Sequence, residues 1–319
     1  QGASSGETRI VRKAYFEGAG YVPLLHRAYE LWDELGLLTR TGALFLGAET
    51  SRVLGGTLAT AQQWDLPYEL LDAAEVTRRF PAFTPPPGTA GLLEQDAGWV
   101  SPEAAVAAQF DRAARAGADL RHGEPVTSWT ETAAGVRVTT DAGTYDAGAL
   151  VVAPGRWAEE LLPGLPVPLR VEPRTVRFYA PTDPAQFTPD RFPVWIWERD
   201  DGTAPYGFPL LGSGVKAAIH HSTVRPGGDW DAAEVAAMLA PLLPRLGDRV
   251  VKELPCTYTM TPDEDYVVGR LPGTAHVVVA CGLSGHGFKL TPVLGEVLAD
   301  LATTGTTAHD LGLFDPQRS

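Results

Sequence analysis

The segment that most constrains this chain is a strand, a glycine-rich turn and a helix near its C-terminal end. Residues His276–Ala280 are mostly apolar and β-branched, which predicts a buried strand. Gly282, Gly285 and Gly287 follow, and Thr291–Leu301 has the pattern of a helix. Main-chain N–H groups and the positive end of the helix dipole meet at such a helix start, so this turn favours a negatively charged guest.

Two guests and one plain alternative fit the turn. A phosphate is one guest, and the N1/C2=O edge of a reduced, anionic flavin is the other. The glycines stand in the order G-x-x-G-x-G, which differs from the G-x-G-x-x-G fingerprint of dinucleotide sites. The alternative is an ordinary glycine-rich connection. Lys289 ends the turn, where a partly buried ammonium needs an anion such as a substrate carboxylate.

The length and composition exclude several classes of protein. A chain of 319 residues can form two domains, or one domain with a large insert. The net charge of −13 argues against a nucleic-acid-binding face, and no apolar run approaches the roughly 20 residues of a membrane span. The N-terminus lacks the apolar stretch of a signal peptide. We therefore expect a cytoplasmic protein that binds neither nucleic acid nor membrane.

The pattern of predicted elements indicates an α/β domain that is interrupted and then resumes. Helices are predicted at Gly20–Gly36, Ala73–Phe80 and Ala104–Ala116, and short strands at Thr41–Leu46, Val126–Thr130, Gly135–Thr140 and Thr144–Asp146. The apolar run Ala149–Ala153 predicts a strand in the middle of a parallel sheet. From about 169 to 257, predicted strands (Val171–Tyr179, Val194–Trp197, Val215–His220) surround one helix, Asp231–Leu246. That stretch predicts a large mixed or antiparallel sheet.

Cys256 is the first candidate for chemistry outside the glycine turn. It lies in the polar, loop-like stretch 255–259, where a cysteine can be a nucleophile, a covalent anchor or an inert thiol. No histidine or second cysteine stands beside it at ligand spacing, so we expect no metal site.

Two pairs of basic residues are further candidates. Arg9 and Arg12 are three positions apart and can share one face, where their planar forks suit a carboxylate or a phosphate. Lys216 and His220 are four apart, so on a strand they point to the same side. The alternative for each pair is an exposed polar surface.

These fragments together resemble one family of flavoenzymes. The stretches Gly6–Arg12, Gly207–Pro209, Cys256–Thr259 and Gly282–Lys289 are similar to the monomeric sarcosine oxidase and N-methyltryptophan oxidase family, within the larger group that includes D-amino-acid oxidase. The resemblance implies an FAD-binding Rossmann-like domain formed by residues 1–42, 98–158 and 257–319. It implies a substrate-binding domain formed by residues 43–97 and 159–256, and a monomer.

The resemblance also implies roles for single residues. Cys256 is similar to the cysteine that forms a thioether to the flavin 8α-methyl group. Arg12 and Lys289 are similar to the pair that holds the substrate carboxylate. Arg9 favours the anionic reduced flavin, and Lys216 stabilises the negative charge that develops when O2 is reduced. Polar residues of the substrate pocket are Tyr206, His220 and Tyr258, beside the apolar Ile196, and His220 and Tyr258 are also candidates for catalysis. Further flavin contacts are Thr8, Gly155, Trp157, Gly282, Gly285, His286, Gly287 and Lys289.

The sequence departs from the family in three places. Ser4-Ser5 stands where sarcosine-type members have a His-His pair, and Pro205 where they have a tyrosine, which argues against sarcosine itself. The family begins with a βαβ unit that carries G-x-G-x-x-G for the ADP part of FAD. No such motif occurs here, and Gln1 aligns just after it, so we expect that an upstream unit has been removed.

The sequence thus predicts an FAD-dependent oxidase of secondary or N-methyl amino acids. A hydride leaves the substrate C–H for flavin N5, the imine is hydrolysed, and O2 becomes hydrogen peroxide. One alternative is a flavin dehydrogenase, or a desaturase of a cyclic imino acid. Another is a non-catalytic remnant without cofactor that binds small carboxylates.

Overall fold

Two sets of sheets and helices make up the chain. The computed structural model describes residues 2–318 and separates the chain into two compact units. Unit 1 consists of Gln1–Ser5, Glu103–Glu172 and Thr257–Ser319, and unit 2 of Gly6–Pro102 and Pro173–Cys256. No helix among the described residues has both the length and the apolar character needed to cross a bilayer.

An eight-stranded sheet organises unit 2. Its order is β15 (Val250–Met260), β11 (Arg170–Tyr179), β14 (Gly214–His221), β13 (Ala204–Leu211), β12 (Val194–Trp197), β3 (Ala43–Gly47), β5 (Ala90–Glu94) and β4 (Glu69–Leu71). Strands β12 and β3 pair in parallel, with Val194 opposite Ala43 and Trp197 opposite Leu46. The neighbouring pairs β12–β13 and β3–β5 are antiparallel, so the predicted mixed sheet is confirmed.

Smaller elements surround this sheet. A three-stranded sheet has the order β1 (Arg9–Val11), β6 (Gly98–Val100) and β2 (Thr39–Arg40). The helices of unit 2 are α1 (Val22–Leu35), α2 (Arg52–Gln63), α3 (Ala73–Arg79) and α6 (Ala232–Leu239), with single 3-10 turns η1 (Ala19–Tyr21) and η3 (Pro184–Gln186). Helix α1 ends at Gly36, whose φ of 66° is the left-handed conformation that glycine adopts without strain.

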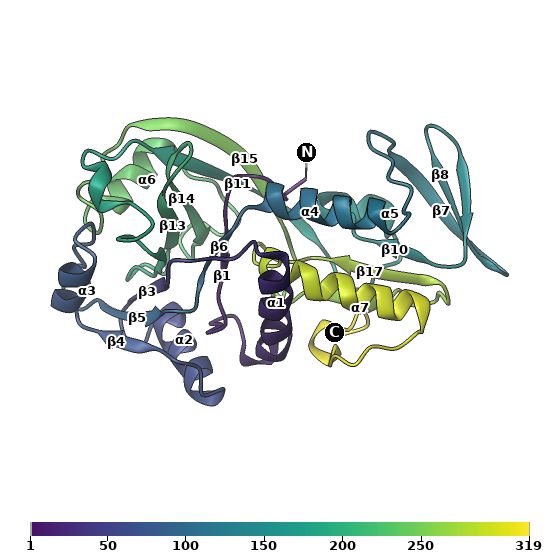
Figure 1. Cartoon of the computed structure of the whole chain (residues 1–319), viewed down its shortest axis with the longest axis horizontal. Coiled ribbons are helices and arrows are strands. Elements are labelled where there is room, and N and C mark those ends of the chain that lie inside the picture. Colours follow the sequence, from purple (N-terminus) through teal and green to yellow (C-terminus); the bar gives the residue numbers. More distant parts are fainter. Residues whose placement is uncertain (1, 319) are drawn as a thin grey trace. The chain divides into compact units, whose positions relative to one another are not determined.

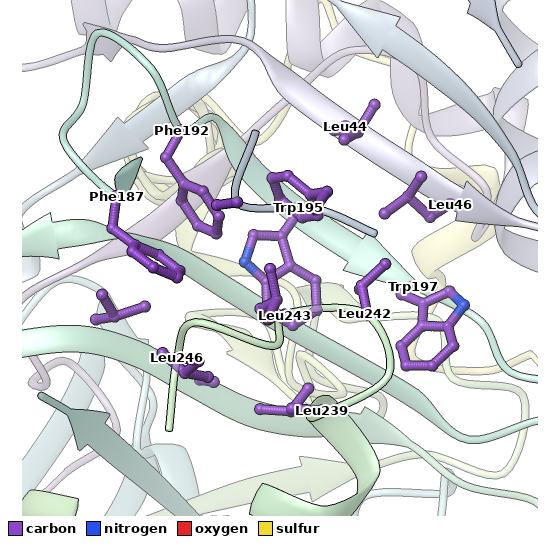
Figure 2. Packing of buried hydrophobic residues seen from close by; sticks show 14 of the residues in the cluster. Leu44, Leu46, Phe187, Phe192, Trp195, Trp197, Leu239, Leu242, Leu243 and Leu246 are labelled. Carbon is purple, nitrogen blue, oxygen red and sulfur yellow. The ribbon is translucent and has the colours of Figure 1, made fainter. Parts of the chain in front are cut away.

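Aromatic side chains fill the core of unit 2. Figure 2 shows Phe187, Phe192 and Trp195 packed together beside the leucines that follow α6. Phe192 also stacks on Phe83, with ring centroids 4.6 Å apart. This core explains why α6 is shorter than the predicted Asp231–Leu246: Pro241 cannot continue a helix, and the chain beyond it packs inward as turns.

Unit 1 is built on a small sheet and a meander. The sheet has the order β10 (Leu150–Val152), β17 (Val277–Cys281) and β16 (Val267–Arg270), with β10 and β17 parallel. The meander is β7 (Val126–Thr132), β8 (Gly135–Thr140) and β9 (Thr144–Ala147). Helices are α4 (Pro102–Arg115), α5 (Ala158–Leu161) and α7 (Thr291–Thr303), and α7 lies along β17 (Figure 1). Three 3-10 turns are η2 (Gly155–Trp157), η4 (Phe288–Leu290) and η5 (Gly312–Phe314).

One sequence prediction about unit 1 is wrong in detail. The apolar run at Ala149–Ala153 predicts a strand inside a parallel sheet, and the structure does contain the parallel strand β10. Among the described residues, however, β10 pairs only with β17, so it is an edge strand and Val151 is exposed.

The two units also divide the chain at other places than the predicted domains. Residues 6–42 belong to unit 2 because β1 pairs with β6 and Ile10 packs on its core. The assignment of 1–42, 98–158 and 257–319 to cofactor binding stays a prediction.

Candidate functional site

Lys216 is a buried cation in unit 2. It lies on β14, and its side chain is 2% exposed. Its ammonium donates to the carbonyl oxygens of Gly6 (2.7 Å) and Thr8 (2.8 Å), and Thr8 Oγ1 lies 3.3 Å away. The ring of Phe208 lies 4.7 Å from the same nitrogen. These acceptors offset the loss of hydration that a buried charge suffers.

Arg9 shares one of these acceptors. Its Nη1 donates to the carbonyl oxygen of Thr8 at 2.7 Å, so this oxygen accepts hydrogen bonds from two cations, Arg9 and Lys216. The structure therefore brings together three residues predicted for the flavin side of the site, Thr8, Arg9 and Lys216.

Arg12 occupies a second buried position in unit 2. Its guanidinium pairs with Glu17, with Nη2 and Oε2 2.5 Å apart, and both side chains are almost inaccessible. The rings of Tyr15 and Phe16 each lie 4.4 Å from its central carbon, and Phe45 lies 5.5 Å away. Arg12 thus already binds a carboxylate inside an aromatic cage, which is the chemistry expected of a carboxylate-binding arginine.

Three of the predicted pocket residues lie beside one another near Arg12. Ile196 on β12 stands opposite Tyr206 on β13, and the Tyr206 ring contacts that of His220 edge to face at 6.2 Å. His220 Nε2 lies 3.7 Å from Glu17 Oε1. The sequence does not indicate Glu17, because only the fold brings this carboxylate to Arg12 and His220.

A buried carboxylate also holds the segment that follows Arg12. Glu94 accepts hydrogen bonds from the main-chain N–H groups of Lys13 (2.7 Å) and Ala14 (3.1 Å). Burial raises the pKa of Glu94, and these two hydrogen bonds act in the opposite direction. Nothing in the sequence around Glu94 signals this role.

The two cysteines lie in different environments. Cys256 is a half-buried cysteine on β15 that forms no disulfide, and the predicted loop around it is wrong: the segment is a strand. The sheet order places β15 at one edge, where a strand tolerates Pro255 because no ladder hydrogen bond is needed on the outer side. Cys281 forms no disulfide either, but it lies buried in β17.

The predicted glycine turn of unit 1 follows β17 directly. Gly282, Ser284 and Gly285 have φ values of 58°, 44° and 79°, which wind the chain back on itself. A Cβ on Gly285 would lie 2.3 Å from ring atoms of Tyr258, so this ring packs on the bare glycine. The turn then enters η4 and α7, as the sequence predicts.

Lys289 lies at the end of this turn and is 5% exposed. Its ammonium donates to the carbonyl of His286 at 2.6 Å. The His286 ring contacts the Tyr266 hydroxyl through Nδ1 (2.9 Å) and the carbonyl of Glu264 through Nε2 (3.0 Å). A carbonyl can only accept, so Nε2 carries a proton. The sequence does not indicate the contributions of Tyr266 and Glu264.

Gly155 and Trp157 form η2, just after β10. Gly155 has a φ of 58° and open space where a Cβ would stand, and Trp157 is exposed. Within residues 2–318, no cluster of three or more His, Cys, Asp or Glu side chains is arranged to hold a metal ion.

Comparison with known proteins gives matches along the whole chain. The family described as FAD dependent oxidoreductase matches residues 1–301. Monomeric sarcosine oxidase from Streptomyces avermitilis is 43% identical, over 100% of this chain and 88% of its own length. N-methyl-L-tryptophan oxidase from Salmonella heidelberg is 36% identical, over 98% of this chain and 88% of its own.

A solved structure agrees with these sequence matches. NikD, described as an unusual amino acid oxidase essential for nikkomycin biosynthesis, superposes with a TM-score of 0.82 at 28% identity. The match covers 99% of this chain and 88% of NikD.

Proposed function

The chain belongs to the family of FAD dependent oxidoreductases, and from that membership we propose that it is an oxidase of secondary or N-methyl amino acids. The observation that carries this proposal is the 43% identity, along the entire chain, to a monomeric sarcosine oxidase. A relative named N-methyl-L-tryptophan oxidase supports the same class of substrate. The small-molecule substrate would be an amino acid whose nitrogen bears a second carbon besides Cα.

Side chains in each unit suit a flavin. A flavin becomes anionic on reduction, and unit 2 offers the cations Arg9 and Lys216 together with Cys256, which forms no disulfide. Unit 1 offers a glycine turn at the start of η4 and α7, ending in Lys289. In this proposal Cys256 carries FAD through a thioether. When bound, FAD accepts a hydride equivalent from the substrate C–H and passes the electrons to O2, which yields hydrogen peroxide.

The remaining polar residues would hold the substrate. Arg12 and Lys289 are cations that each suit the substrate carboxylate, and the pairing of Arg12 with the carboxylate of Glu17 supports this role for its guanidinium. Ile196, Tyr206 and His220 would form one wall around the amino-acid side chain, because they line up across β12, β13 and β14. Tyr258 would add a polar group beside the glycine turn.

Lys216 is proposed for the oxygen step. Its ammonium is fixed by carbonyl oxygens and shielded from solvent, so it would stabilise negative charge that develops as O2 is reduced without reorganising first. We propose in addition that the protein acts as a monomer in the cytoplasm, a compartment that suits two cysteines outside any disulfide.

Peroxide release tests the reaction class. The FAD-loaded full-length protein should release hydrogen peroxide with N-methyl or cyclic amino acids and much less with the matching primary amino acids. Arg12→Lys should lower kcat/KM about 10- to 100-fold, because lysine lacks the planar fork. Arg137→Lys is the matched control, since Arg137 pairs with Asp146 on the exposed face of the meander. Substrate-dependent reduction of an artificial acceptor without peroxide would indicate a dehydrogenase instead.

A further inference from the structure

Residues Gly6 to Thr8 form an unusually tight turn. The N–H of Thr8 donates to the carbonyl of Gly6 at 2.8 Å, two residues back, and the residue between them, Glu7, has a φ of 68°. This combination is the strained form of the γ-turn. Gly6 itself has a φ of 100°, so two successive residues have left-handed backbone. Glycine tolerates this conformation, but glutamate does so only when its surroundings enforce it.

The strained turn holds the buried lysine. The two carbonyls that flank Glu7, those of Gly6 and Thr8, are the ones that accept from the Lys216 ammonium at 2.7 and 2.8 Å. If the Glu7 backbone relaxed to a negative φ, the two carbonyls would no longer face the same nitrogen. The position of this ammonium therefore depends on the conformation of Glu7.

The side chain of Glu7 is clamped in turn. Its carboxylate accepts from Lys252 Nζ at 2.7 Å and from the hydroxyl of Ser213, and Lys252 Nζ lies 3.2 Å from that hydroxyl. Ser213 lies in the connection from β13 to β14, three residues before Lys216. Burial acts to raise the pKa of Glu7, but the hydrogen bonds from Lys252 and Ser213 outweigh it and lower the pKa. The carboxylate is thus charged at neutral pH and binds the turn to the hairpin that carries Lys216.

We propose that Glu7 is a positioning residue for the oxygen step: its clamp to Ser213 and Lys252 keeps the strained turn in place, and the turn holds the Lys216 ammonium where O2 is reduced. This rests on the proposed role of Lys216. A merely structural role for Glu7 would lower stability but would leave the balance between substrate oxidation and O2 reduction unchanged.

Rapid-mixing measurements on the FAD-loaded protein separate these two explanations. In Glu7→Ala, the second-order rate of flavin reoxidation by O2 should fall about 10- to 100-fold, the loss typical of a catalytic group displaced by about 1 Å. The rate of anaerobic flavin reduction by substrate should fall by a factor at least ten times smaller than the factor for reoxidation. Glu7→Gln retains an acceptor oxygen of the same reach and should stay within about threefold of wild type.

Lys252→Met keeps the experiment decisive if Glu7→Ala folds poorly. Lys252 is partly exposed, so its replacement removes the cation of the clamp without touching the turn. In this variant, too, flavin reoxidation by O2 should slow more than flavin reduction by substrate, but the difference should be smaller than in Glu7→Ala. Equal losses in both half-reactions, or no loss, in these variants would overturn the proposal.

A chemical readout tests the clamp independently of activity. Trace acylation of amines, quantified by mass spectrometry, should label Lys216 more slowly than Lys13, which pairs with Asp96. Glu7→Ala and Lys252→Met should raise the labelling of Lys216 relative to Lys13, and an unchanged ratio would overturn the clamp. Lys216→Met tests the proposed role of Lys216 by itself. If the flavin of this variant is reoxidised at the wild-type rate, that role fails. The labelling ratio of Lys216 to Lys13 still decides whether Glu7 positions the lysine.

Discussion

At the scale of single residues, the two thiols of this chain should react very differently. Cys256 is half-buried on an edge strand, whereas burial raises the pKa of Cys281 to about 12. A thiol reacts as its thiolate, so at about pH 8 iodoacetamide should modify Cys256 in protein prepared without FAD and leave Cys281 intact. Peptide mapping by mass spectrometry measures this. Both cysteines should react in urea, and alkylation of Cys281 in the folded protein at a similar rate would contradict the prediction.

Residues could be predicted from the sequence where their chemistry is local. Lys289 follows a glycine turn into a helix, which predicted a partly buried ammonium, and the structure buries it. The role of Glu17 could not be predicted, because it depends on contacts with Arg12 and His220 that only the fold creates. The strain at Glu7 could not be predicted either, since its cause is Lys252, 245 residues away in the chain.

At the scale of elements, Gly285 in the turn after β17 should be intolerant of any side chain. In Gly285→Ala, the new Cβ would lie 2.3 Å from the Tyr258 ring, at a φ of 79° that disfavours alanine. We expect the free energy of unfolding to fall by roughly 3 kcal/mol, from backbone strain plus overpacking. Urea unfolding followed by tryptophan fluorescence measures the change.

Gly295→Ala is the matched control for this prediction. Gly295 lies in α7 and is exposed, with no atom within 4 Å of the place that a methyl group would occupy. Alanine is a better helix former than glycine, so this variant should gain about 0.5–1 kcal/mol. A Gly285→Ala protein as stable as Gly295→Ala would show that the turn does not pack as described.

Elements with local start and stop signals were predicted well. The helix predicted at Ala104–Ala116 is α4, Pro102–Arg115, and α1 ends at the predicted Gly36. Strand β13 was missed because it contains Pro205 and Pro209, residues that normally exclude a central strand. The structure places register shifts at these two prolines, so the sheet absorbs them as irregularities.

At the scale of the whole molecule, covalent attachment of FAD would change how stability depends on cofactor concentration. A thioether at Cys256, as proposed above, would make the melting temperature of the FAD-loaded protein independent of added FAD. In Cys256→Ser the cofactor can exchange, so stability should rise by about 1.4 kcal/mol for each tenfold excess of FAD over its Kd. Scanning calorimetry at a series of FAD concentrations measures the stability of the wild type and of Cys256→Ser. Cys281→Ala is the control and should behave as wild type.

Flavin absorbance of the denatured protein can contradict this prediction in two ways. If denatured Cys256→Ser still carries flavin absorbance, the attachment site lies elsewhere. If wild-type protein loses its flavin on denaturation, the thioether does not exist. Either result leaves membership of the FAD dependent oxidoreductase family unchanged, because that rests on the match over residues 1–301.

The class of fold could be predicted from the sequence, whereas the pairing of strands distant in the chain could not. The α/β texture and the large mixed sheet both follow from local hydrophobic patterns. The parallel pairing of β12 with β3 has no local signal, since the partners lie about 150 residues apart, as the difference between Val194 and Ala43 shows. The same holds for the pairing of β1 with β6, in which Arg9 lies opposite Val100.

The pairing of β3 with β12 has a consequence for synthesis on the ribosome. At about 5–20 residues per second, the roughly 150 residues from Ala43 to Val194 take about 8 to 30 s to translate. During that interval one edge of β3, an apolar strand, has no partner, and unpaired apolar edges promote aggregation. Newly made chains should therefore depend on chaperones until Trp197 has left the exit tunnel.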